Sequence, residues 1–227
     1  PDNRLPELRR ALARNGWLAL TEAADVGGAA LTPEHEGVLL EELQRRGVSS
    51  LLDGPHAELR RALRARGTVD QSGRLLPGIA GGDLTVWRPL IDFEAELDPG
   101  DLCVRAYQDG DDYLLEGDAL FSGAGRRTDL LWTLAVGDPE APPAESTIAL
   151  LVPGDLAGIG VETPQRLGPD ASHRVTFDHV RVPRSALLGR EGEGWVDMRA
   201  AVMDAPHVDA APPEDREVEA LLRYAAT

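Results

Sequence analysis

The segment VTFDHVRVPRSALLGREGEGW, residues 175–195, carries the most informative pattern in the chain. Apolar and polar residues alternate through its first half, which predicts a strand with one buried face. Glycines follow at positions 189, 192 and 194, and an apolar helical pattern begins directly after them. We therefore expect this segment to be the junction between the last strand of a β domain and a following helix.

Period-two patterns also precede this junction. We expect strands at residues 102–107, 113–116, 130–136, 147–152 and 173–182. The first two flank Asp109-Gly110, a dipeptide that is typical of a β-hairpin turn. Several short strands at this spacing predict a small β-barrel or sandwich.

The first eighty residues instead repeat apolar residues at helical spacing, beginning with Leu8, Ala11 and Leu12. Thr32 and Pro33 combine a capping hydroxyl with a proline at the first helical position, which predicts a helix start. A further helix is expected from about Pro55 to Gly67.

The stretch after that helix is interpreted as non-helical. We expect a short turn at residues 69–75 and a loop at PGIAGGD, residues 77–83, because glycine and proline interrupt regular structure. A last helix is expected at residues 214–226, where apolar residues return at helical spacing. The predicted fold is thus α+β in three parts: an all-helical N-terminal domain (residues 1–83), a small β-barrel or sandwich domain (84–193) and a short C-terminal helical stub (194–227).

Composition excludes several classes of function. The formal charge of −16 repels nucleic-acid phosphates and anionic membranes, so no nucleic-acid or membrane partner is expected. The longest apolar runs are far too short to cross a bilayer, and the first residues lack the apolar core of a signal peptide. We therefore expect a cytoplasmic protein. Every basic residue is arginine, which excludes a Walker-type phosphate loop and a pyridoxal-phosphate Schiff base, since both need lysine.

The metal-binding residue types are sparse. Cys103 is the single cysteine, so it forms no internal disulfide or cysteine zinc site, and we expect it to be a small core residue. His173 and His179 lie six residues apart on one predicted strand and should share a face. A surface or barrel-packing role for both is favoured over a metal site, and no metal ligand is predicted.

Several motifs occur in a recognisable order. They are the helical stretch GWLALTEAADVGGAALTPEHEGVLLEEL (16–43), Gly67-Thr68, LPGIAGG (76–82), FDHVRVP (177–183) and GEGW (192–195). In sequence and in order they resemble the acyl-CoA dehydrogenase family over about residues 5–195. The domain order of helices, small β domain and helices is also that of the family.

The resemblance implies a flavoprotein. In the family, FAD is held by the β domain and the helical bundle that follows it, and the flavin accepts hydride from the β-carbon of an acyl-CoA while a glutamate removes the α-proton. Within GDALFSGAG, residues 117–125, the resemblance assigns Phe121, Ser122 and Gly123 as FAD contacts, by stacking and hydrogen bonding. It also implies an acyl-CoA substrate and a homo- or hetero-oligomer, including one with a complete acyl-CoA dehydrogenase subunit.

The chain departs from the family at three points. The Thr-Glu-Pro and Gly-Ser-Asp signature is replaced by LTVWRPLIDFEAELDPG (84–100), which lacks glycine before its last position. Ala119 stands where lysine is usual. The C-terminal bundle that carries the catalytic base is not found within the 227 residues, so we expect a truncated member and assign no catalytic residue.

Three hypotheses follow. The first is an acyl-CoA dehydrogenase-like flavoprotein, or a subunit of one, that carries out α,β-oxidation of an acyl-CoA thioester with hydride transfer to FAD; the prediction leans towards such an enzyme. The alternative is a non-catalytic structural partner subunit of a heteromeric acyl-CoA dehydrogenase complex, with lost flavin binding. The third is an oxygen-using monooxygenase on the same fold.

Overall fold

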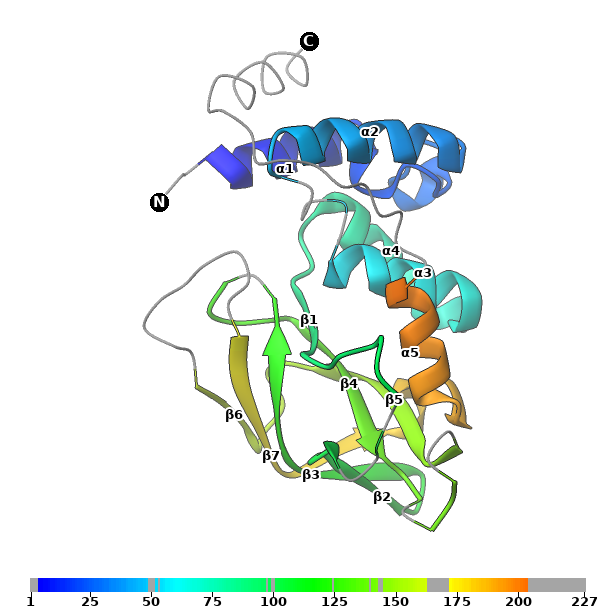
Figure 1. The fold of residues 1–227 in the computed structure, drawn as a ribbon, viewed down its shortest axis with the longest axis vertical. Coiled ribbons are helices and arrows are strands. Elements are labelled where there is room, and N and C mark those ends of the chain that lie inside the picture. Colours follow the sequence, from blue (N-terminus) through cyan, green and yellow to red (C-terminus); the bar gives the residue numbers. More distant parts are fainter. Residues whose placement is uncertain are drawn as a thin grey trace. The chain divides into compact units, whose positions relative to one another are not determined.

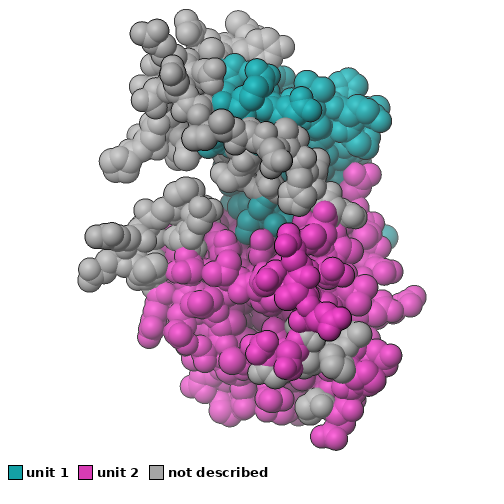
Figure 2. Space-filling model, in the orientation of Figure 1, with its two compact units in different colours: residues 1–60, 69–84, 205–227 teal, residues 61–68, 85–204 magenta. Residues whose placement is uncertain are grey.

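The structure is a computed structural model of the chain. It describes residues 4–48, 52, 54–96, 98, 101–123, 125–138, 140–142, 145–162 and 172–203. The chain divides into two compact units, residues 1–60, 69–84 and 205–227 in the first and residues 61–68 and 85–204 in the second (Figure 2). The predicted domain limits of 83/84 and 193/194 stay a prediction.

The first unit is helical. Its elements are α1 (Arg4–Arg14), α2 (Pro33–Arg45), the first half of α3 (Pro55–Arg66), α4 (Val69–Gly81) and the short 3-10 turns η1 (Trp17–Ala19) and η2 (Ala24–Val26). As predicted, α2 begins with Thr32 at its N-cap and Pro33 in its first turn. The apolar faces meet in one core that contains Leu8, Leu12, Leu18, Leu40, Leu43, Val48 and Leu52.

The helix α4 corrects the predicted turn and loop at residues 69–83. Leu75, Leu76, Ile79 and Ala80 are buried at helical spacing, whereas Pro77 is exposed. A proline inside a helix removes one backbone hydrogen bond and crowds the preceding turn. Here the apolar face of the helix is buried in spite of it. The local glycine and proline pattern therefore gave the wrong prediction, because burial of one face outweighed it.

A buried guanidinium joins the helices of this unit. Arg60 of α3 donates to Thr21 Oγ1 at 2.9 Å and forms ion pairs with Glu36 of α2 and Glu22. Only 2% of Arg60 is exposed. A buried charge is tolerated when it is both paired and hydrogen-bonded, so these contacts fix how the three segments pack.

The second unit is built on an eight-stranded sheet (Figure 1). Its strands are β1 (Val86–Pro89), β2 (Arg105–Asp109), β3 (Asp112–Ser122), β4 (Leu130–Val136), β5 (Thr147–Pro153), β6 (Ile159–Glu162), β7 (Ser172–Pro183) and β8 (Leu187–Gly192). The order is β6-β7-β3-β1-β4-β5-β8, and β2 pairs with both β3 and β4. The strand β1 also pairs with both β3 and β4. Thus β1 and β2 each hydrogen-bond to β3 on one side and to β4 on the other, at different positions along these two strands. The sheet is not a closed barrel, and of the two predicted forms a sandwich fits it better.

The predicted hairpin is confirmed. Asp109 pairs with Asp112 across a two-residue turn, and Gly110 has a φ of 64°, a conformation that glycine adopts without steric strain. Arg181 of β7 forms ion pairs with both aspartates. These same carboxylates raise the pKa of Arg181, first by hydrogen bonding with Asp109.

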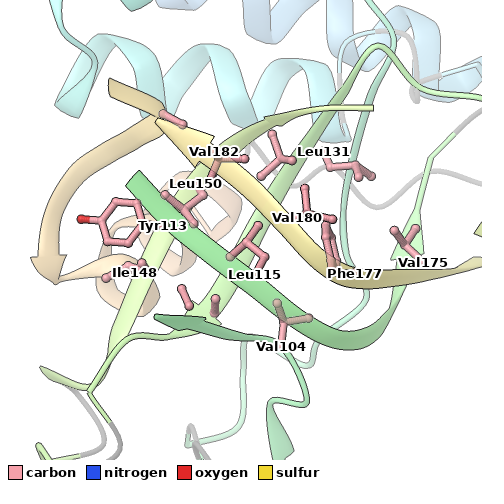
Figure 3. Packing of buried hydrophobic residues seen from close by; sticks show 14 of the residues in the cluster. Val104, Tyr113, Leu115, Leu131, Ile148, Leu150, Val175, Phe177, Val180 and Val182 are labelled. Atoms are coloured by element: carbon pink, nitrogen blue, oxygen red, sulfur yellow. The ribbon is translucent and has the colours of Figure 1, made fainter. Parts of the chain in front are cut away.

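The core of this unit lies on the inner face of the sheet. Figure 3 shows Leu115, Phe177, Val180 and Leu131 directed towards one another from β3, β7 and β4. The strands β4 and β5 are buried along nearly their whole length, which explains their uninterrupted apolar sequences.

The predicted strand-to-helix junction is also confirmed. After β8 the chain enters α5 (Gly194–Met203), which packs against β5 and β8. The backbone amide of Trp195 donates to Thr147 Oγ1 at 2.8 Å and joins the first turn of the helix to the start of β5. Arg61 and Arg199 add hydrogen bonds to the carbonyl oxygens of Ala201 and Phe93, both at 2.8 Å.

Two residue-level predictions were wrong. His173 is buried and His179 is exposed, because a bulge opposite Glu116 places the adjacent residues Asp178 and His179 both outwards. His179 Nδ1 hydrogen-bonds Asp178 Oδ1 at 2.8 Å, and its Nε2 forms an ion pair with Glu116 Oε1 at 2.9 Å. The hydrogen bond to Asp178 and the charge of Glu116 raise the pKa of His179. Cys103 is exposed, although its neighbours Leu102 and Val104 are buried.

The predicted helix at residues 214–226 lies outside the described residues. Among the helices that are described, none combines the length and the apolar character needed to span a membrane.

Candidate functional site

The three predicted FAD contacts lie at the end of β3, between β1 and β7. Ser122 pairs with Arg88 of β1 and with Ser172 of β7. Phe121 pairs with Pro89 and His173 on the same two strands. The fold therefore brings the short strand after residue 85 and the start of β7 to the predicted contacts, although they are distant in sequence.

Phe121 and Ser122 point to opposite faces of the sheet, as consecutive strand residues do. Phe121 is 0% exposed and packs in the core, 6.2 Å from the ring centroid of Phe177. Ser122 is half-buried on the other face. One ligand lying on one face of the sheet cannot contact both side chains.

Gly123 is closed off by an aromatic pair that the sequence analysis did not single out. The rings of Trp87 and His173 stack with centroids 3.9 Å apart and an interplanar angle of 6°. The Nε2 of His173 lies 3.2 Å from the Gly123 carbonyl oxygen, which can only accept, so this nitrogen carries the proton. A Cβ at Gly123 would lie 1.9 Å from Cδ1 of Trp87, so only glycine fits beside the indole.

The side chains of Trp87, Phe121 and His173 are each 0% exposed. We call them the sealed aromatic cluster. A ligand that stacks on an aromatic side chain needs one open ring face. The described residues therefore do not fit a flavin ring stacked on Phe121.

The outer face of the same strands is more open and more polar. Arg88, Leu120, Ser122, Ser172 and Arg174 lie on it, as neighbours across β1, β3 and β7. Arg174 forms an ion pair with Asp118, and the Arg88 guanidinium lies 5.3 Å from the centroid of Phe93. Hydroxyl groups and guanidinium groups on a surface such as this can hydrogen-bond carbonyl or phosphate oxygens.

Neither a metal centre nor a catalytic base is found within the described part of the chain. No group of three or more His, Cys, Asp or Glu side chains there could hold a metal ion. No described residue has the motif that would assign it to proton abstraction.

The helical unit, the β unit and the junction at residue 194 together match one known domain arrangement. The family model for the N-terminal domain of acyl-CoA dehydrogenases matches residues 2–83. The chain belongs to the acyl-CoA dehydrogenase family. The helical stretch that suggested this family from sequence lies within the matched range.

Curated members of the acyl-CoA dehydrogenase family match over both units. Acyl-CoA dehydrogenase FadE29 of Mycobacterium tuberculosis is 28% identical over 192 residues, which are 82% of this chain and 48% of the relative. FadE12 of the same species is 30% identical with the same coverage, and the mitochondrial isobutyryl-CoA dehydrogenase of Dictyostelium discoideum is 27% identical over 83% of this chain and 46% of its own length. The chain spans about half the length of these relatives.

Solved acyl-CoA dehydrogenase structures share the fold. The Tcur3481-Tcur3483 steroid ACAD, in its G363A variant, superposes with a TM-score of 0.71 at 28% identity, over 88% of this chain and 52% of that one. The acyl-CoA dehydrogenase of Geobacillus kaustophilus has a TM-score of 0.72 at 22% identity, over 97% of this chain and 57% of the other, which supports the fold alone.

Proposed function

We propose that this chain is a structural subunit of a heteromeric acyl-CoA dehydrogenase, in which another chain supplies the flavin site and the catalytic base. The assembly would oxidise an acyl-CoA thioester between its α- and β-carbons. This chain would contribute its β unit as a docking and support module.

The sealed aromatic cluster carries this proposal. An open flavin site should present its contact residues to solvent when no flavin is present. Phe121 and Trp87 are instead 0% exposed, and the indole leaves no space for even a methyl group at Gly123. Because protein interiors are close-packed, admitting a flavin ring there would require Trp87 to leave its stack on His173.

The name of one relative also supports an assembly of two different chains. One of the solved structures above carries two designations in its name, Tcur3481-Tcur3483, which is how a protein of two different chains is described. This structure is 28% identical in sequence to the chain and covers 88% of it. A two-chain assembly is therefore a reasonable arrangement to test.

A second candidate is an acyl-CoA dehydrogenase that binds FAD itself. The outer face of β1, β3 and β7 favours it, because Ser122 and Ser172 carry hydroxyl groups beside Arg88. In this version Ser122 would hydrogen-bond the flavin, while Phe121 and Gly123 would support that contact from within the sheet. The resemblance noted from sequence assigns all three residues to FAD.

The two candidates differ in where the flavin is found. The chain would be purified alone and co-expressed with a complete acyl-CoA dehydrogenase chain from the same genome, and flavin absorbance and native mass would be measured for both samples. A colourless chain that joins a flavin-bearing partner supports the structural subunit. A chain that binds stoichiometric FAD alone and oxidises an acyl-CoA contradicts it and supports the second candidate.

A matched pair of variants sharpens this test. Ser122→Ala removes a hydroxyl from the outer face, whereas Thr176→Ala removes one from an exposed position farther along β7. If the chain itself binds FAD through Ser122, only the first variant weakens FAD binding, by about tenfold for one lost hydrogen bond. Equal FAD binding in both variants would contradict a role for Ser122.

A further inference from the structure

A pocket of about 270 Å³ lies in the second unit, where Leu120 of β3 pairs with Arg174 of β7 on the outer face of the sheet. The rest of its lining comes from residues 89–91 after β1, from residues 101–104 before β2, and from Asp118, Ala119 and Leu134. All of these residues belong to the same compact unit. We call this hollow the leucine pocket.

The lining of the leucine pocket is mainly apolar. Leu102, Val104 and Leu134 line it and are buried, whereas Leu90 and Leu120 are 53% and 43% exposed. The backbone amide of Leu90 donates to the Leu120 carbonyl oxygen at 2.7 Å, so these two exposed leucines are neighbours. One exposed leucine is ordinary, but two neighbouring ones beside an apolar hollow are typical of a surface that another molecule covers.

The size of the pocket restricts its occupant. Sites for whole organic ligands commonly measure roughly 300–1,000 Å³, whereas a cavity of about 150 Å³ holds one benzene ring. The leucine pocket, at about 270 Å³, therefore accommodates a single aromatic side chain and is too small for a flavin cofactor. Aromatic side chains seated in apolar pockets with a polar rim supply much of the binding energy of protein–protein interfaces.

The surroundings of the pocket are acidic. The segment at residues 91–101 begins and ends in the pocket lining. It contains no basic residue and five carboxylates, those of Asp92, Glu94, Glu96, Asp98 and Asp101. Arg88 and Arg199 contact this segment, and Arg174 in the lining forms an ion pair with Asp118. Carboxylates remain in excess, so charge complementarity favours a basic occupant.

We propose that the leucine pocket receives one aromatic side chain of the partner chain, from a segment in which basic residues flank that side chain. The ring would lie between Leu90 and Leu120, above the buried leucines and valine of the lining. The basic residues would lie beside Asp101 and the acidic segment that precedes it. This inference rests on the proposed role of the β unit as a docking module, and it names the chemistry of the segment that docks.

The single cysteine of the chain makes a direct test possible. Cys103 lines the pocket and is exposed. Short peptides with an N-terminal cysteine would be equilibrated with the full chain in a cysteamine–cystamine buffer, and intact mass would give the fraction linked to Cys103 by a disulfide. The probes are Cys-Gly-Arg-Phe-Arg, Cys-Gly-Arg-Ala-Arg and Cys-Gly-Glu-Phe-Glu. They share the same thiol and backbone, so their capture ratios report the side chains.

We expect the Arg-Phe-Arg peptide to be captured about tenfold more tightly than the Arg-Ala-Arg peptide, because the phenyl ring leaves water for the pocket. Its advantage over the Glu-Phe-Glu peptide should be smaller, about threefold, because exposed ion pairs are weak.

Variants locate the ring. Leu90→Ser and Leu120→Ser should each reduce the preference for phenylalanine over alanine. Val161→Ser is the matched control, because Val161 is 40% exposed on β6 and does not line the pocket. Circular dichroism of each variant establishes that it is folded.

The charge preference has its own pair of variants. Asp101→Asn should reduce the advantage of the Arg-Phe-Arg peptide over the Glu-Phe-Glu peptide. Asp155→Asn, at an exposed position in the turn after β5, should leave it unchanged.

Three results would overturn the proposal. The first is equal capture of the phenylalanine and alanine peptides by the wild-type chain. The second is an unchanged phenylalanine preference in both folded leucine variants. The third is equal or stronger capture of the Glu-Phe-Glu peptide, which would contradict a basic partner segment.

Failure of this inference can be told apart from failure of the proposed function. If a flavin-bearing partner joins the chain but the pocket shows no preference for phenylalanine, the partner docks elsewhere and only this inference fails. If the pocket selects the Arg-Phe-Arg peptide but no flavin-bearing partner joins, the pocket stands as a docking site and the proposed function fails.

Discussion

At the scale of single residues, the indole ring of Trp87 requires glycine at position 123, because it leaves no space for a side chain there. The Gly123 carbonyl oxygen accepts the hydrogen bond from His173, and the Gly123 α-carbon lies against the indole of Trp87. The same contacts that exclude a side chain at Gly123 also hold the sealed aromatic cluster together. This cluster belongs to the core of the β unit, whatever else the neighbouring strands bind.

Gly123→Ala should destabilise the protein. The added methyl group would overlap the indole, and overpacking of this kind costs roughly 1–3 kcal/mol. Gly37→Ala is the matched control, because a Cβ at this position inside α2 meets nothing within 4 Å. It should stabilise the protein by about 0.5–1 kcal/mol through its helix propensity. Urea unfolding measures both changes, and equal effects of the two substitutions would contradict the packing argument.

Tyr113 should titrate at unusually high pH. Burial, reinforced by the hydrogen bond to Glu191, raises the pKa of its hydroxyl to about 12. Ultraviolet absorbance titration would follow phenolate formation, with Tyr113→Phe identifying the transition. Glu191→Gln should lower this pKa, since it removes the charge that opposes a phenolate. An unchanged pKa in that variant would show that Glu191 has no part in the shift.

The same shift sets the sign of a pH effect on stability. The folded state holds the phenolic proton more tightly than the unfolded chain, whose tyrosine pKa is about 10. The stabilisation is therefore fully present below about pH 10 and is lost as the pH rises through about 12.

At the scale of elements, α4 shows burial overriding local sequence preference. Its buried residues stand on one face, and Pro77 stands on the exposed face, where its ring displaces no core residue. The helix ends with the amides of Asp83 and Leu84 bonded to the Gly78 carbonyl oxygen, both at 3.0 Å. Such a closure satisfies carbonyl groups that a helix end would otherwise leave unpaired.

Pro77→Ala should stabilise the protein. Alanine restores the backbone donor and removes the crowding of the preceding turn, and the helix-interior penalty of proline is up to about 3 kcal/mol. The gain will be smaller than this, because proline also restricts the unfolded chain. Thermal and urea unfolding measure it. A lower stability of the variant would mean that the proline ring makes contacts that matter more than the lost hydrogen bond.

At the scale of the whole molecule, the acidic charge is the dominant property. The formal charge of −16 is spread over a chain of 227 residues without a single lysine. Like charges repel in the compact state, and salt weakens this repulsion over a Debye length of about 10 Å at 0.1 M.

The melting temperature should therefore rise when NaCl is increased from about 0.01 M to about 0.15 M at neutral pH, where screening of exposed charges becomes effective. The rise should be smaller near the sequence pI of about 4.7, where the net charge is small. Differential scanning fluorimetry measures both series. A melting temperature that does not respond to salt at neutral pH would show that the negative charges are compensated locally.

The sequence by itself determined the features that depend on neighbouring residues. The Asp109-Gly110 hairpin, the start of α2 at Thr32 and the apolar strands β4 and β5 could all be predicted, because turn geometry, capping and strand burial act over a few residues. The junction at residues 175–195 was predicted for the same reason. The acyl-CoA dehydrogenase family was inferred separately, from the resemblance of several motifs in their order along the chain.

Only the tertiary structure decided the features that depend on distant residues. The stack of Trp87 on His173, the outward turn of His179 at a bulge and the ion pair of Arg66 with Asp197 each join segments far apart in the chain. Composition and spacing carry no information about such contacts, because they arise from sheet pairing and core packing. The predicted FAD contact at Phe121 was a reasonable assignment from sequence. Its burial could be seen only once β1 and β7 were in place on either side of it.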